Sequence, residues 1–224
     1  MPMNSLEDDR RLRALLSRLH ARSVAQGEVL RAHVAETGIR AVAGSAEDVV
    51  RDRPFWSDKL VALDPDKAEF CYRLCRALGA HKVVEAGTSY GVSTLYLAAA
   101  MRDNGGGVVI GAEYEAEKAR AARANFAEAG LAEFVDLREG DLRETLKTLQ
   151  GPVDLLLMDI WIPMVLPAIE LVTPHLRPGA VAIADNTATF RDAYAEYFAF
   201  LATSGFTTQT LPFDGGLEMS VKLG

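Results

Sequence analysis

The sequence predicts an α/β fold in which a mostly parallel sheet is covered by helices on both faces. Two observations carry this prediction. From His81 onward, short apolar runs alternate with amphipathic helical patterns, an order that is typical of parallel strands joined by crossover helices. The chain then closes with two apolar runs separated by Asp214-Gly215-Gly216, which is a hairpin signal. We therefore expect the last strand to run antiparallel.

The individual elements follow from the hydrophobic period and from the turn residues. Residues from about 6 to 36 have a helical period, and residues 36–56 indicate a connection and a short helix. Asp64-Pro65-Asp66 starts a further helix that runs to about Leu78. The predicted strands are KVVEAG (82–87), GVVIGAE (107–113), EFVDLRE (133–139), VDLLLMD (153–159), AVAIADN (180–186), FTTQTLPF (206–213) and LEMSVKLG (217–224). The helices between them begin near Val92, Glu115, Leu142, Met164 and Phe190.

The composition excludes several classes of protein. With 224 residues, 49% of them hydrophobic, the chain can bury the core of one domain, with or without an extension. A formal net charge of -7 argues against an electrostatic binder of nucleic acid or of membranes. Cys71 and Cys75 are too few for a disulfide framework and are interpreted as buried thiols. Acidic residues near the N-terminus and broken apolar runs predict a cytoplasmic protein without a membrane span.

The ends of the predicted strands carry the candidate site residues, because ligands of an open α/β sheet bind beyond the carboxyl ends of its strands. The first strand ends in EAGTSYGVST, where Gly87 and Gly91 allow a sharp turn and the next helix presents its N-terminal amides. The second strand ends at Glu113, whose carboxylate can accept both hydroxyls of a ribose. The third leads to Gly140-Asp141, where an acid can meet the edge of an adenine.

This pattern discriminates between nucleotide-derived ligands. A nicotinamide dinucleotide is bound by G-x-G-x-x-G, but Glu85 stands where the first glycine belongs. An acid there suits a cationic amino acid better than a pyrophosphate, and S-adenosylmethionine joins such a group to an adenosine. Glu85, Glu113 and Asp141 together therefore indicate S-adenosylmethionine. The alternatives are a nicotinamide-dependent oxidoreductase, a module that binds the cofactor without methyl transfer, and a purely structural turn.

Two further strand ends carry oxygen ligands. Asp159 ends the run LLLMD, and Asp185 with Asn186 ends the run AVAIADN. Two carboxylates and an amide oxygen form a set that suits Mg²⁺, with Ca²⁺ or Mn²⁺ as alternatives. Such a cation lowers the pKa of a bound substrate hydroxyl and aligns it for reaction. The competing interpretation is that Asp159 caps a helix and Asp185-Asn186 begins a loop.

With these motifs the chain resembles the class I S-adenosylmethionine-dependent methyltransferases, and among them the cation-dependent O-methyltransferases of the catechol and caffeoyl-CoA type. The similarity runs from about Asp64 to the C-terminus through PDKAEF, EAGTSYGVST, MDIW, LRPGAVAIADN and DGGLE. It implies a Rossmann-like seven-stranded sheet of order 3-2-1-4-5-7-6 with strand 7 antiparallel. It also implies transfer of a methyl group from S-adenosylmethionine to a hydroxyl of a small, catechol-like acceptor with a divalent cation.

The resemblance also implies the roles of individual residues. The cation would bind Asp159, Asp185 and Asn186, and Trp161 would form one wall of the acceptor pocket. Catalysis would rest on Asp159 and on Glu218, which stands where catechol-type members place an acid near the substrate hydroxyls. The cofactor contacts would come from Leu63, Glu85, Gly87, Thr88, Tyr90, Gly91, Ser93, Glu113, Tyr114, Asp141, Asp159 and Trp161.

In this interpretation the chain has two parts. Residues 1–60 form a helical extension, and residues 61–224 form the methyltransferase domain. In the family the extension contributes to dimers and to the acceptor pocket, so we expect a homodimer that binds a small-molecule acceptor and neither nucleic acid nor membrane. The leucine stripe of residues 12–19 would face the core or a subunit interface, and Phe55 with Trp56 would close over the acceptor or pack as an anchor.

One position departs from the family. Catechol-type members place a lysine base three residues after the strand-end aspartate, where this chain has Ile162. Isoleucine cannot accept a proton, which leaves three hypotheses. The cation alone acidifies the acceptor or Glu218 takes the proton; the acceptor is more acidic than a catechol; or the metal site is a relic. The last hypothesis predicts a metal-independent methyltransferase with a different acceptor.

Overall fold

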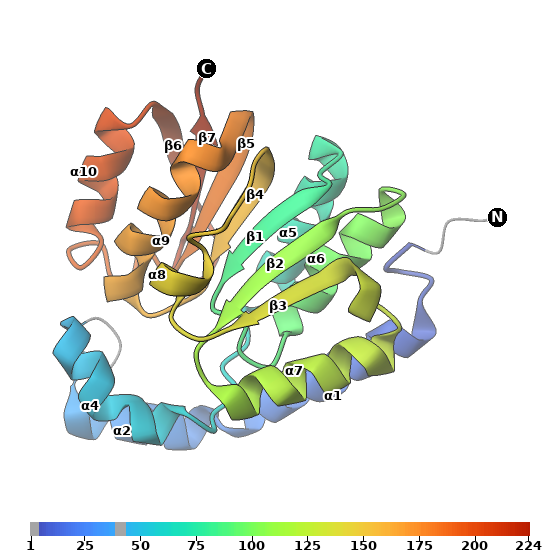
Figure 1. Ribbon diagram of the computed structural model, residues 1–224. Coiled ribbons are helices and arrows are strands. Elements are labelled where there is room, and N and C mark those ends of the chain that lie inside the picture. The colour runs from blue at the N-terminus through green and yellow to red at the C-terminus, as the bar shows by residue number, and fades with distance from the viewer. Residues whose placement is uncertain (1–4, 39–43) are drawn as a thin grey trace.

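A single sheet organises the molecule. The structure is a computed structural model that describes residues 5–38 and 44–224. Within these residues the strands form a seven-stranded sheet of order β3-β2-β1-β4-β5-β7-β6 (Figure 1). The pairs β1–β2, β1–β4, β2–β3 and β4–β5 are parallel, and β7 is antiparallel to both β5 and β6. The predicted fold class, strand order and antiparallel last strand are confirmed.

The strands lie close to the predicted apolar runs. They are β1 (Lys82–Ala86), β2 (Val108–Glu113), β3 (Val135–Glu139), β4 (Val153–Met158), β5 (Leu176–Asp185), β6 (Phe206–Leu211) and β7 (Leu217–Lys222). β1 and β4 are adjacent central strands, in which Val84 pairs with Leu156. Apart from Lys82 and Asp154, the side chains of both strands are buried on both faces of the sheet, which explains why these runs are mostly apolar.

Helices cover both faces of the sheet, as Figure 1 shows. The bounds are α1 (Arg10–Ala25), α2 (Gly27–Thr37), α4 (Ala46–Trp56), α5 (Pro65–Leu78), α6 (Val92–Asp103), α7 (Ala116–Ala129), α8 (Leu142–Thr145), α9 (Val165–Val172) and α10 (Ala195–Thr203). Helices α1, α5, α6 and α7 bury their apolar residues in the core on one face. Helices α8, α9 and α10 do so on the other face.

Two helix predictions need correction. The single helix expected over residues 6–36 is divided at Gln26, which ends α1 and precedes α2. Gly27 follows Gln26 and weakens a continuous helix, and the Gln26 side chain instead accepts a hydrogen bond from the Leu60 amide. The helix expected near Phe190 begins later, at Ala195. Residues 39–43, part of the predicted connection, lie outside the described residues.

The N-terminal helix α1 belongs to the core beneath the sheet. Its leucine stripe is buried in the same cluster as Val83 of β1 and Leu95 of α6. The stripe consists of Leu12, Leu15, Leu16 and Leu19. The predicted leucine stripe therefore faces the core. No helix among the described residues is both long and apolar enough to cross a membrane.

Candidate functional site

The glycine turn after β1 is built on close backbone contact. Gly87, Ser89 and Gly91 all have positive φ angles, of 96°, 51° and 80°. A Cβ on Gly87 would lie 2.1 Å from the Asp159 carbonyl oxygen, and one on Gly91 would lie 2.4 Å from the Phe126 ring. The turn is therefore pressed against the end of β4 on one side and against α7 on the other, and only glycine fits at either position.

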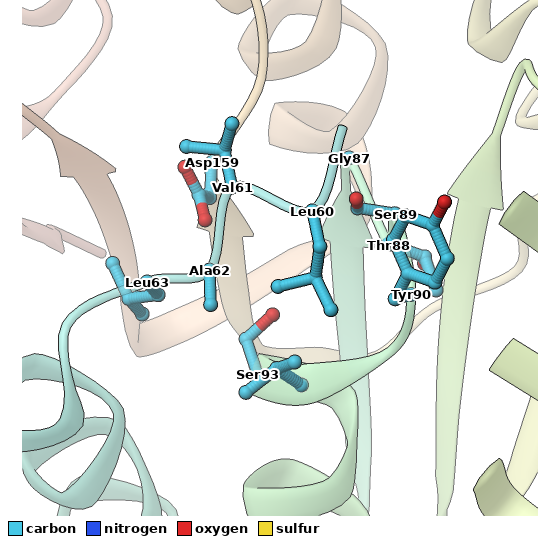
Figure 2. A pocket seen from close by; sticks show the side chains of 11 residues that line it. Leu60, Val61, Ala62, Leu63, Gly87, Thr88, Ser89, Tyr90, Ser93 and Asp159 are labelled. Carbon is cyan, nitrogen blue, oxygen red and sulfur yellow. The ribbon is translucent and has the colours of Figure 1, made fainter. Parts of the chain in front are cut away.

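A small pocket of about 210 Å³, part of which is open to solvent, lies beside this turn. Figure 2 shows its lining, in which the segment of residues 60–63 crosses in front of the turn. Among the predicted cofactor residues, the structure gathers Leu63, Gly87, Thr88, Tyr90, Ser93 and Asp159 around the pocket. It adds Leu60, Val61, Ala62, Ser89 and Val92. Sequence reasoning missed residues 60–62 because this segment has no period of its own.

Glu85 supports the turn from inside the sheet. Its carboxylate is fully buried and accepts hydrogen bonds from the hydroxyls of Thr88 at 2.9 Å, Ser93 at 2.7 Å and Thr94 at 2.5 Å. Burial raises the pKa of Glu85, although the three hydroxyls oppose that shift. Direct contact between Glu85 and the cationic amino acid part of the cofactor stays a prediction. The hydroxyl partners hold its oxygens beneath the turn.

Glu113 connects the end of β2 to the same turn. Its two oxygens accept hydrogen bonds from the backbone amides of Ser89 at 2.6 Å and Glu115 at 2.7 Å. Burial raises the pKa of Glu113, and the two amides and Lys118 oppose the shift. Each carboxylate oxygen carries two lone pairs, so both oxygens keep one acceptor position that a ligand hydroxyl can use.

Two other predicted cofactor residues lie at the margin of the site. Tyr114 is exposed, and the Arg53 guanidinium of α4 lies over its ring at 4.2 Å from the centroid. Asp141 caps α8 by accepting from the Arg143 amide at 2.9 Å, and it also forms an ion pair with the Arg143 side chain. The hydrogen bond from the Arg143 side chain lowers the pKa of Asp141, and the Arg143 amide and charge add to this effect. A contact with adenine at Asp141 stays a prediction.

The ends of β4 and β5 bring together two carboxylates and a lysine. Asp159 donates its backbone amide to the Ala86 carbonyl at 3.1 Å, which places its side chain at the pocket. Burial raises the pKa of Asp159 well above its ordinary value, and the charge of Asp185 adds to the shift. Burial also raises the pKa of Asp185, against the effect of its hydrogen bond with Lys67. The two carboxylates are therefore electrostatic neighbours.

Lys67 is the site residue that sequence reasoning missed. Its ammonium lies 2.7 Å from Asp185 Oδ1 and 3.5 Å from Asp64 Oδ2, and its side chain is 1% exposed. Burial lowers the pKa of Lys67, but Asp185 and Asp64 outweigh burial and raise it overall, so the ammonium stays charged. One signal was present in the sequence: a lysine in the first turn of α5 opposes the helix dipole, which indicates a nearby carboxylate.

The predicted cation ligands do not form an open donor set. One Asp185 oxygen accepts from Lys67, and the other accepts from the Asn186 amide nitrogen at 2.7 Å. The Asn186 oxygen faces the final hairpin, where a Cβ on Gly215 would lie 2.4 Å from it. The described residues contain no cluster of three or more His, Cys, Asp or Glu side chains suited to a metal, and the predicted set of two carboxylates and one amide is smaller than such a cluster. The buried ammonium of Lys67 beside Asp185 disfavours a divalent cation in this arrangement, and binding of the cation stays a prediction.

Glu218 lies away from these carboxylates. In the register of β5 and β7, Glu218 pairs with Ala184 while Asp185 pairs with Leu217. Because neighbouring residues of a strand point to opposite faces of the sheet, Glu218 and Asp185 lie on different faces. The Glu218 carboxylate accepts hydrogen bonds from the hydroxyls of Thr208 and Thr210 of β6. The structure therefore does not bring Glu218 to the proposed reaction centre, which corrects that expectation.

Aromatic residues of α4 pack against Trp161, which follows the end of β4. Trp161 follows Asp159 after one residue, and its ring meets Trp56 edge to face with centroids 5.3 Å apart. The Trp56 indole donates to Asp52 at 2.6 Å, and Phe55 stacks on His33. Trp56 is buried, so the packed anchor is the arrangement observed. Ile162 begins a short 3-10 helix.

The sheet order and the glycine turn define the class I methyltransferase fold. Residues 84–187 match a family model described as a methyltransferase domain. The chain is 34% identical over 127 residues to a catechol O-methyltransferase of Mycobacterium tuberculosis, and 30% identical over 130 residues to one of Niastella koreensis. These alignments cover 56% of this chain, and 57% and 58% of the respective relatives.

A solved structure gives the same relationship. The crystal structure of the O-methyltransferase TomG from Streptomyces achromogenes, in complex with S-adenosylmethionine, superposes with a TM-score of 0.67 at 25% identity. It covers 77% of this chain and 86% of that protein. The predicted resemblance is thus confirmed: residues 84–187 match the methyltransferase domain model, and the chain is similar in sequence to catechol O-methyltransferases. It spans less than two thirds of either curated relative.

Proposed function

We propose that this protein is an S-adenosylmethionine-dependent O-methyltransferase that acts on a hydroxyl of a small, aromatic, catechol-like molecule. The observation that carries the proposal is the glycine turn beside the pocket, with Glu113 bound to the turn at the end of the second strand. The relatives named catechol O-methyltransferase and the cofactor in TomG support the same assignment.

The cofactor has a place along this turn. Its ribose hydroxyls would donate to the remaining acceptor positions of Glu113, and its methionine part would enter the pocket near Leu63, Ser93 and Asp159. The segment of residues 60–63 would cover the cofactor from the solvent side. Tyr90, whose hydroxyl donates to the Asp58 carbonyl at 2.9 Å, connects the turn to the chain that leads into this segment.

The reaction forms a bond between the acceptor oxygen and the methyl carbon. The carbon–sulfur bond breaks, its electron pair moves to sulfur, and the hydroxyl proton leaves to a base. A phenol has a pKa of about 10 and needs such help at neutral pH. Among the predicted catalytic residues, Asp159 is the carboxylate that lines the pocket, and we assign it as the candidate base. The cation-assisted and the metal-independent forms of this reaction both remain compatible with that assignment.

The test is a cofactor titration followed by a transfer assay. We expect S-adenosylmethionine to bind in isothermal titration calorimetry, and Glu113→Gln to bind about tenfold more weakly because a charged acceptor is lost. Glu139→Gln is the matched control, since Glu139 ends the adjacent strand in register with Glu113 and pairs on the surface with Arg123. Mass spectrometry would then detect methylated catechols.

The outcomes separate the candidate functions. Binding of S-adenosylmethionine with turnover of a phenol supports the proposal. Binding of NAD instead would replace it with an oxidoreductase. Saturable cofactor binding without turnover of any phenol would leave a cofactor-binding module or a different acceptor class.

A further inference from the structure

Lys67 occupies an unusual position for a lysine. It lies in the first turn of α5, and Pro65 directly follows the N-cap residue Asp64 of that helix. A cation there is disfavoured by the helix dipole, and burial of an ammonium costs more unless it is paired. The position is therefore stable because the ammonium meets Asp185 at 2.7 Å.

The charges of the site balance around this lysine. The charge of Asp185 disfavours the ionised form of Asp159. Two buried carboxylates require positive charge or protons nearby. Among the described residues, Lys67 is the cation that contacts Asp185, and its charge also acts on Asp159. The chain thus supplies with its own side chain part of the charge that a metal ion would supply.

A divalent cation and this ammonium compete for the same oxygen. Mg²⁺ requires lone pairs at about 2.0–2.1 Å in octahedral geometry, whereas an ammonium has three donors and no lone pair. With Lys67 on one Asp185 oxygen and Asn186 on the other, a metal at Asp185 would share its oxygen with a donor already bound there, and the ammonium beside it would repel the charge of the metal. The exposed Asp64 carboxylate, 3.5 Å from the ammonium, is where a displaced Lys67 would go.

We propose that Lys67 is a positioning residue that takes the electrostatic place of the divalent cation, so that methyl transfer in this protein requires no metal. Its ammonium holds Asp185, neutralises charge beside Asp159, and keeps the cation ligands closed. The inference rests on the proposed methyltransferase function for its kinetic consequences, but its prediction for metal binding stands without that function.

The experiment compares the intact protein with Lys67→Met, which keeps the length of the side chain and removes its charge. We expect the wild type, saturated with S-adenosylmethionine, to bind no Mn²⁺ at about 1 mM by electron paramagnetic resonance. Its turnover should be unchanged by EDTA. Lys67→Met should lose about 100-fold in turnover without metal, gain Mn²⁺ binding, and recover turnover when Mg²⁺ is added.

Two controls keep the result interpretable. Lys147→Met removes an exposed lysine that pairs with Glu144 on the surface, and it should change neither metal binding nor turnover. Lys67→Arg keeps the charge and should remain free of Mn²⁺. A purely structural role for Lys67 would lower stability in Lys67→Met without producing metal binding or rescue by Mg²⁺, and that result overturns the proposal.

Other outcomes also decide the matter. Mn²⁺ binding to the wild type would overturn the proposal, because a metal would then displace Lys67 from Asp185. Wild-type turnover that EDTA abolishes and Mg²⁺ restores would overturn it in the same way. If Lys67→Met does not fold, the wild-type Mn²⁺ titration still gives this answer. If the wild type methylates no acceptor, the proposed function fails separately, because the contrast in Mn²⁺ binding between wild type and Lys67→Met is measured without turnover.

Discussion

At the scale of single residues, Gly87 joins backbone conformation to close packing. Its φ of +96° is unfavourable for other residues, and an added Cβ would lie 2.1 Å from the Asp159 carbonyl oxygen. Gly87→Ala must therefore push the turn away from the end of β4. We expect a loss of about 3 kcal/mol in the free energy of unfolding, together with loss of S-adenosylmethionine binding, as measured by urea denaturation and calorimetry.

Gly105 provides the matched control for this prediction. Its φ is +87°, yet no described atom lies within 4 Å of the position that a Cβ would take. Gly105→Ala should therefore show the backbone strain alone, about 1–2 kcal/mol, with cofactor affinity unchanged. Equal losses in the two variants would show that contact with Asp159 does not limit position 87.

The strand-end acids show what a single sequence can and cannot predict at this scale. Strand alternation located Glu85 and Glu113 correctly, because a strand end is defined by its own apolar run. The direction of each carboxylate depends on partners that the run does not contain, such as the hydroxyls that hold Glu85. Lys67 was missed for the same reason, since Asp185 is 118 positions away in the chain.

At the scale of elements, Asp154 joins three adjacent strands. Its carboxylate accepts from the backbone amides of His81 and Lys82 at 2.8 and 2.9 Å, and from Arg177 Nε at 2.6 Å. Asp154→Ala leaves these donors without a partner at the start of β1 and β5. We expect a loss of about 2 kcal/mol in the free energy of unfolding at pH 7, measured by urea denaturation.

This loss depends on pH with a defined sign. Burial raises the pKa of Asp154, but the hydrogen bonds from Arg177 and the two amides outweigh burial and lower it overall. A lowered folded-state pKa stabilises the protein above the unfolded value of about 3.9, and the stabilisation disappears as pH falls through the folded-state pKa. The difference between wild type and Asp154→Ala should therefore shrink below about pH 4.

Asp136 provides the control that tests whether removal of any aspartate from a strand lowers the free energy of unfolding as much as Asp154→Ala. It lies in β3 and its half-exposed side chain pairs with Arg138. Asp136→Ala should change the free energy of unfolding by less than about 0.5 kcal/mol, as is usual for exposed ion pairs. A loss comparable to that of Asp154→Ala would remove the special role assigned to the three-strand connection.

Element boundaries were predictable where strong local signals existed. Helix α5 begins at Pro65, as Asp64-Pro65-Asp66 indicated, and α6 begins at Val92 after the second glycine of the turn. The start of α10 at Ala195 was predicted too early. The segment before α10 contains backbone hydrogen bonds, such as the one from the Tyr194 amide to the Phe190 carbonyl. These bonds form turns but no continuous helix. Such turns have no distinct hydrophobic period.

At the scale of the whole molecule, sheet topology explains why distant motifs meet. Parallel strands bring their carboxyl ends to one edge, so the glycine turn and Asp159 converge although the sequence separates them. Glu218 was assigned to the same site by resemblance, but the antiparallel register of β7 places it on the other face from Asp185. The alternation of strands and helices and the closing hairpin were predictable from the residues, and the strand order followed from the family resemblance. The face on which a side chain lies at the edge of the sheet depended on register.

The same scale decides whether the first 60 residues form a separable part. Leu15 of α1 is fully buried in the core that contains Val83 and Leu95, so Leu15→Ala should cost about 3 kcal/mol in the free energy of unfolding. Val24 lies on the same helix but is 79% exposed, so it provides the matched control. Val24→Ala should lower the free energy of unfolding by less than about 0.5 kcal/mol.

The form of this unfolding transition distinguishes an integral helix from an appended one. The sequence has two tryptophans, Trp56 of α4 and Trp161 after β4, with ring centroids 5.3 Å apart, so fluorescence reports the contact between the N-terminal part and the sheet. If α1 completes the core, Leu15→Ala shifts the transitions seen by fluorescence and by circular dichroism together. A loss of helical signal at low denaturant, with the fluorescence transition in place, would show instead that α1 unfolds alone. The boundary between two stability units would then lie between α1 and α4, before residue 60, because Trp56 and the sheet would keep their contact without the leucine stripe.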